Sequence, residues 1–152
     1  MHFKGDLGMK KLFVIGGLLL GLGLVVFFVK EQMSIVTSQK AMFSVVSVDN
    51  MSEMVINRYE DNALVTVRDK AVIDRIVSDL SGMELKRDNG TPPVGDYAVR
   101  IYTESGEQLG MELHKSGEYL WLNSSKYGGQ LYKVVKGKDF LETIEEELDR
   151  EN

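Results

Sequence analysis

The residues that could carry chemistry in this 152-residue chain are few. The chain has no cysteine, which excludes a thiolate metal site, a disulfide framework and a thiol nucleophile. Of its two histidines, His2 and His114, only His114 lies in the folded part, so any Ser–His–Asp arrangement would depend on it. His114 stands beside a turn-like Lys-Ser-Gly sequence, and no Gly-x-Ser-x-Gly motif is present. We therefore predict no catalytic residue, no metal site and no cofactor.

Paired carboxylates are the remaining catalytic candidates. Residues 31–152 carry 22 acidic and 14 basic side chains, a net charge of −8. Two converging carboxylates could hydrolyse a glycosidic bond, but the sequence does not identify a pair that converges. A net acidic domain also lacks the clustered Lys and Arg side chains that nucleic acid requires, so we expect no nucleic-acid binding.

Aromatic side chains form the most distinctive group. Tyr119 and Trp121 alternate with Leu120 and Leu122. Side chains alternate across a strand, so the aromatic pair points away from the face on which the leucines lie. The face opposite the core is predicted to carry Arg100, Tyr102, Glu112, His114, Tyr119 and Trp121. Exposed aromatics beside charges are typical of partner-binding surfaces. The alternatives are that this strand is buried on both faces, or that a preceding stalk covers it.

An apolar run over residues 12–29 contains no charged side chain and lies between Lys10-Lys11 and Lys30. As a helix it would be about 27 Å long, which is close to the thickness of the hydrocarbon core of a membrane. The run is longer than the apolar part of a signal peptide, and no suitable small-residue pair follows it closely. We therefore predict an uncleaved transmembrane signal anchor. The alternative is the same domain secreted after signal cleavage.

The flanking lysines predict the orientation of this anchor. Lys4, Lys10 and Lys11 precede the run and favour a cytoplasmic N-terminus, residues 1–11. The predicted location is the cell membrane, crossed once, with residues 30–50 as a stalk or linker and residues 51–152 as an extracytoplasmic domain. Gly17 and Gly21 have the small-xxx-small spacing that lets two helices approach closely, which makes a homodimer through the membrane helix one hypothesis. Glycine is also common in membrane helices without such a contact.

The rest of the pattern predicts an α+β domain. Residues 54–59 and 63–67 favour a β-hairpin, and Asp69 is a candidate N-cap for a helix that ends at Gly82 with a left-handed cap. Residues 139–150 favour a second helix, with Asp139 and Glu142 at capping-box spacing. Short, glycine-bearing turns separate the strands of a meander, expected at residues 96–103, 108–114, 118–123 and 130–135. The predicted fold is an N-terminal transmembrane helix followed by an antiparallel β-sheet with two helices packed on one face.

This layout resembles the small, uncharacterised membrane-anchored or lipoprotein ectodomains of Gram-positive bacteria. The resemblance lies in the Lys10-Lys11 plus apolar-anchor opening and in the meander of residues 96–135. Within that meander it rests on the strands Tyr119-Leu120-Trp121-Leu122 and Gln130-Leu131-Tyr132. The resemblance implies an extracytoplasmic domain of the bacterial cell envelope, with no known catalytic residues to carry over.

Two functions are compatible with these observations. The first is a non-catalytic, membrane-tethered extracytoplasmic binding domain, whose partner would be an envelope protein or a cell-wall component. The second is a small cell-envelope hydrolase, which would need converging polar groups in a pocket. The sequence offers a tether and a surface but no such set of polar groups, so the binding domain is our prediction.

Overall fold

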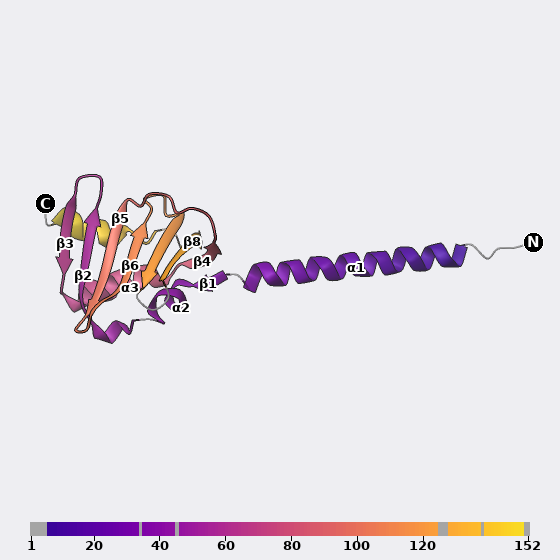
Figure 1. Ribbon diagram of the computed structural model, residues 1–152, viewed down its shortest axis with the longest axis horizontal. Coiled ribbons are helices and arrows are strands. Elements are labelled where there is room, and N and C mark those ends of the chain that lie inside the picture. The colour runs from indigo at the N-terminus through magenta and orange to yellow at the C-terminus, as the bar shows by residue number, and fades with distance from the viewer. Residues whose placement is uncertain (1–5, 34, 45, 125–127, 138, 151–152) are drawn as a thin grey trace, which may run out of the picture. The chain divides into compact units, whose positions relative to one another are not determined.

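The computed structural model describes residues 6–33, 35–44, 46–124, 128–137 and 139–150. The chain divides into two compact units, residues 1–34 and residues 35–152 (Figure 1). The first unit contains the helix α1 (Asp6–Met33), and the second contains a sheet with three helices.

Helix α1 is 28 residues long. Its described large hydrophobic side chains, which lie between Val14 and Val29, are 49–71% exposed. The side chains of Leu12, Phe13 and Phe28, which belong to the predicted membrane segment, lie outside the described residues. Among the residues that are described, no helix combines the length and the apolar character needed to cross a membrane, so the transmembrane segment over residues 12–29 stays a prediction.

The second unit is built on one antiparallel sheet, which has eight strands within the described part of the chain. The strands are β1 (Ile35–Thr37), β2 (Met51–Arg58), β3 (Ala63–Val67), β4 (Glu84–Asp88), β5 (Tyr97–Thr103), β6 (Gly106–Leu113), β7 (Tyr119–Ser124) and β8 (Gly128–Lys136). Their order across the sheet is β1-β4-β8-β7-β6-β5-β2-β3 (Figure 1). The helices are α2 (Ser38–Phe43), α3 (Lys70–Ser81) and α4 (Glu142–Arg150), with a short 3₁₀ helix at Val48–Asn50.

The predicted hairpin and meander are confirmed. Strands β2 and β3 pair with each other, and β5 to β8 pair in sequence order, all antiparallel. The short, glycine-bearing connections allow this pattern because antiparallel neighbours need only tight turns.

Residues 35–50 do not form the predicted stalk. Strand β1 pairs with β4, with Val36 opposite Leu85. The Thr37 side chain then caps α2 by accepting a hydrogen bond from the backbone N–H of Lys40, at 3.4 Å. Met42 and Val46 are 0% and 2% exposed and belong to the core. The prediction of a linker over residues 30–50 is therefore corrected for the described residues 35–44 and 46–50, because β1 joins the sheet and Met42 and Val46 are buried in the core.

Helix α3 begins as predicted, and its end differs in detail. The Asp69 carboxylate accepts a hydrogen bond from the backbone N–H of Ala71 at 2.8 Å. At the other end, Gly82 has a φ of −73°, so the expected left-handed cap is wrong.

Helix α4 begins at Glu142, three residues later than predicted, so Asp139 and Glu142 do not stand at the N-cap and N3 positions that the expected capping box requires. The physical reason is the burial of Phe140, which is 1% exposed and inserts into the core from the turn before the helix.

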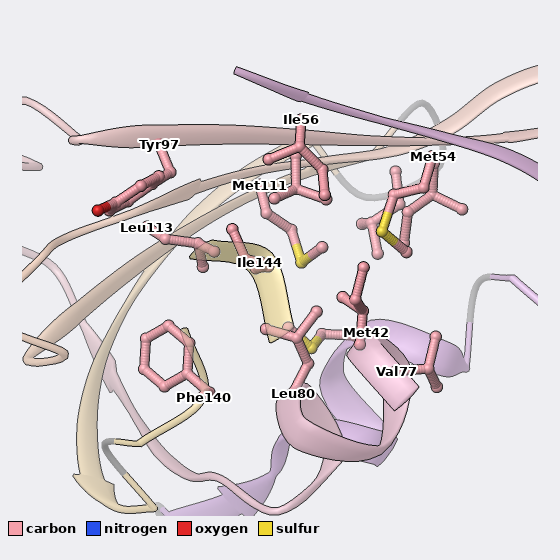
Figure 2. Close-up of a cluster of buried hydrophobic side chains, with 14 of the residues drawn as sticks. Met42, Met54, Ile56, Val77, Leu80, Tyr97, Met111, Leu113, Phe140 and Ile144 are labelled. Carbon is pink, nitrogen blue, oxygen red and sulfur yellow. The ribbon is translucent and has the colours of Figure 1, made fainter. Parts of the chain in front are cut away.

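The core lies between the helices and one face of the sheet. Figure 2 shows Met42, Leu80 and Ile144 facing Met54 and Met111 of the strands. These five side chains are at most 2% exposed. The alternation expected from the sequence is confirmed by the buried residues Val99, Ile101, Leu109, Met111, Leu113, Leu120 and Leu122. Three helices, rather than the predicted two, thus contribute to a one-sided core.

Candidate functional site

The six residues predicted for a partner-binding surface lie on the sheet face opposite the core, which we call the open face. Arg100 and Glu112 are exposed on it. The half-buried members of the set are Tyr102, His114, Tyr119 and Trp121. Their common orientation follows from the two-residue period of strands whose leucine, isoleucine and valine side chains face the core.

The structure brings four of these residues together and places two further along β5. Glu112, His114, Tyr119 and Trp121 surround one small hollow, with Pro93, Gly95 and Leu131 completing its wall. Trp121 stands directly opposite Glu112 on one side and Leu131 on the other. Arg100 is opposite Gly110, and Tyr102 lies two residues beyond Arg100.

The ring of Trp121 in β7 reaches over Gly129 of the neighbouring strand β8. A Cβ atom placed on Gly129 would lie 2.1 Å from Cζ2 of Trp121, so the indole ring occupies the space above this glycine. The hollow beside the ring has a volume of about 10 Å³, room for no more than about one water molecule. Trp121 is therefore not fully buried between two layers of the domain. It is half-buried, with Pro93 and Gly95 of the loop before β5 beside it.

His114 takes part in a local turn. Its Nδ1 is 2.9 Å from the Ser116 hydroxyl and 3.6 Å from the Asp96 carboxylate. The same Nδ1 accepts a hydrogen bond from the backbone N–H of Ser116 at 3.3 Å. In a catalytic triad the serine and the carboxylate contact opposite nitrogens of the imidazole ring. Here both lie at Nδ1, so the geometry is that of a turn between β6 and β7.

A cluster of three ion pairs surrounds Arg58 at the end of β2. Its guanidinium is 2.8 Å from Asp61, 2.7 Å from Glu145 and 3.0 Å from Asp149. The hydrogen bonds from Arg58 and from the backbone N–H of Ala63 lower the pKa of Asp61 to about 2. The pKa of Tyr97 is raised mainly by burial of its side chain, and in addition by the hydrogen bond that its hydroxyl donates to Glu145. Because these contacts join α4 to the hairpin of β2 and β3, we assign the cluster a structural role.

Among the described residues of the domain, two of the larger hollows lie elsewhere. One, of about 580 Å³, is lined mostly by polar residues, from residues 46–52 at the start of β2 and from residues 103–105 at the end of β5. The other, of about 450 Å³, lies between α2 and the ends of the central strands, and we call it the α2 pocket. Among the described residues, no group of three or more His, Asp or Glu side chains could hold a metal ion.

Sequence reasoning missed the α2 pocket. Lys40 and Arg87 are two of its lining residues, and 47 positions separate them in the chain. They come together because β1 pairs with β4 and α2 follows β1 directly. No local pattern marks this pairing, since β1 has only three residues and precedes a segment that we predicted as a stalk.

Comparisons with known proteins give little further information. No protein-family model matches this chain, and no curated protein does. A solved structure described as "Putative Lipoprotein from Clostridium perfringens" is similar, with a TM-score of 0.46 and 15% identity. The match covers 68% of this chain and 84% of that chain. At this level of similarity the match says nothing about a ligand or an activity.

Proposed function

We propose that this protein is a non-catalytic binding domain, tethered to the cell membrane by residues 12–29 and displayed outside the cytoplasm. The observation that carries the binding role is the open face, which presents half-buried aromatic rings beside exposed Arg100 and Glu112. The tether rests on the uncharged run of residues 12–29 and on the exposed apolar side chains along α1.

The argument for the tether is the unfavourable free energy of exposing the apolar surface of residues 12–29 to water. Apolar area removed from water contributes about 25 cal/mol per Å². A continuous apolar helix without a partner surface therefore favours a lipid environment. The three lysines before residue 12 favour a cytoplasmic N-terminus.

We expect the domain to be accessible from outside the cell. Protease added to intact spheroplasts should digest residues 51–152 while an N-terminal tag on the full-length chain stays protected. The chain should also remain in the membrane pellet after extraction with alkaline carbonate. Digestion of the tag alone would show that the orientation is the opposite of the proposed one. A shortened soluble product would show that the signal is cleaved and is not an anchor.

The open face suits a macromolecular partner. Small-molecule sites are usually concave, with volumes of roughly 300–1,000 Å³, whereas the hollow beside Trp121 has about 10 Å³. Surfaces that combine aromatic side chains with arginine are typical of protein interfaces. We therefore propose an envelope protein or a cell-wall polymer as the partner.

A photo-crosslinking residue tests this surface in living cells. Arg100 replaced by p-benzoylphenylalanine should give a discrete adduct of higher mass on irradiation, because its exposed position lies on the open face. The control is the same replacement of Ser78, an exposed residue of α3 on the helical side. Equal adducts at both positions, or none at Arg100, would refute the assignment of the open face.

The alternative function, a small envelope hydrolase, stays a hypothesis, as does a homodimer through Gly17 and Gly21. Among the described residues, no specific contact favours either one. In the described part of α1, both glycines have open space where a Cβ would stand.

A further inference from the structure

The α2 pocket combines an apolar floor with a cationic rim. Leu109, Leu122 and Tyr132 of the sheet form its floor and are 1%, 5% and 7% exposed. Lys40 from α2 and Arg87 from the end of β4 are exposed at its edge. Its volume of about 450 Å³ lies within the range of roughly 300–1,000 Å³ that is usual for small-ligand sites.

The charge of the pocket contrasts with that of the rest of the domain. Residues 31–152 have a net charge of −8, yet no Asp or Glu is among the described residues that line this pocket. Lys70 and Lys136 lie 2.8 and 3.4 Å from carboxylates. Within the described residues, neither Lys40 nor Arg87 has such an ion pair. Two cations that have no carboxylate partner in the described part of the chain, beside an apolar floor, complement a ligand that is both anionic and apolar.

The chain itself links this pocket to the proposed membrane segment. Val36, which lines the pocket, is seven residues after Val29, the last residue of the apolar run. Seven residues span at most about 25 Å when fully extended, so a membrane-embedded residue 29 would keep Val36 near the lipid headgroups.

We propose that the α2 pocket binds an anionic glycerophospholipid, with Lys40 and Arg87 contacting the phosphate and the apolar floor contacting the first part of an acyl chain. This inference rests on the membrane tether of the proposed function. It adds a second site, on the opposite side of the sheet from the open face. A bound lipid would link α2 and β4 to the membrane surface.

Photoactivatable lipids test the proposal on the full-length chain. The protein is reconstituted in phosphatidylcholine vesicles that contain a small fraction of phosphatidylglycerol with a diazirine in its acyl chain. After irradiation, peptides that contain Leu109, Leu122 or Val36 should carry the lipid adduct. Photoactivatable phosphatidylcholine in the same vesicles should label them several-fold less, since it lacks the net negative charge.

Paired substitutions identify the cationic contacts. The double variant Lys40→Gln/Arg87→Gln should lose labelling of these peptides by at least about tenfold, because both charge-assisted contacts to the phosphate are removed. The control Arg68→Gln/Lys133→Gln removes the same charge from exposed positions outside the pocket and should label like the wild type. Fluorescence melts that follow Trp121, the sole tryptophan, check that each variant is folded.

Four outcomes would overturn the lipid site. They are labelling confined to α1, equal labelling by both lipids, labelling that survives the double substitution in a folded protein, and labelling abolished by free inorganic phosphate. The last would identify a site for a soluble anion instead of a lipid. Extraction with alkaline carbonate tests the membrane tether separately. If residues 12–29 do not anchor the chain, carbonate releases it from the vesicles. A retained chain without labelled pocket peptides refutes the lipid site alone.

Discussion

Replacing Met42 with alanine should lower the free energy of unfolding of the domain by about 3 kcal/mol. Met42 lies in α2 and is 0% exposed, in contact with the core that α3 and α4 share with the sheet (Figure 2). Truncation removes buried methylene and thioether groups and leaves a cavity that close-packed neighbours fill only partly. Such an effect is expected only if residues 38–43 belong to the folded domain.

Thermal unfolding of the full-length chain measures this loss. The fluorescence of Trp121 reports on the domain alone, since no other tryptophan is present. The Met42→Ala melting temperature should fall by roughly 10 °C. Gln39→Ala is the matched control, an exposed position in the same helix, and should change stability by less than about 0.5 kcal/mol. Equal melting temperatures for Met42→Ala and the wild type would instead support the stalk that the sequence predicts for residues 30–50.

Replacing Gly137 with alanine should lower the free energy of unfolding of the domain by about 3 kcal/mol, for two separate reasons. Gly137 follows β8 and has a φ of +76°, a left-handed conformation that costs other residues about 1–2 kcal/mol. A Cβ at this position would also lie 2.8 Å from the carbonyl oxygen of Gly82 and 3.2 Å from Cα of Met83. Both contacts are with backbone, so relief requires a shift of the connection between α3 and β4.

Gly128→Ala separates the two contributions. Gly128 begins β8 with a φ of +70°, but no atom of the described residues lies within 4 Å of the position that its Cβ would occupy. This variant should therefore lose only the conformational part, about 1–2 kcal/mol. The comparison is made by chemical denaturation followed by Trp121 fluorescence. Equal losses for the two variants would contradict the role of the contact between Gly137 and Gly82.

The fold was largely predictable wherever the pattern is local. The spacing of Val72, Ile73, Ile76, Val77 and Leu80 predicts α3, and Asp69 marks its start. Alternation in β5 to β7 predicts which side chains are buried, because a strand has only two faces. The same alternation placed Tyr119 and Trp121 on the open face. How far their rings would be covered was not predictable, since Gly129 and the loop that contains Pro93 approach Trp121 only in the folded chain.

Sequence by itself determined the apolar run over residues 12–29, the acidic balance of the domain, the absence of cysteine chemistry and the two-faced meander. Each of these properties belongs to single residues or to neighbours within a few positions. Tertiary structure alone decided that residues 35–50 join the domain, that Phe140 delays the start of α4, and that Lys40 and Arg87 share a pocket. The physical reason is that pairing between β1 and β4, and burial of Met42 and Phe140, depend on the shape of a core assembled from distant segments.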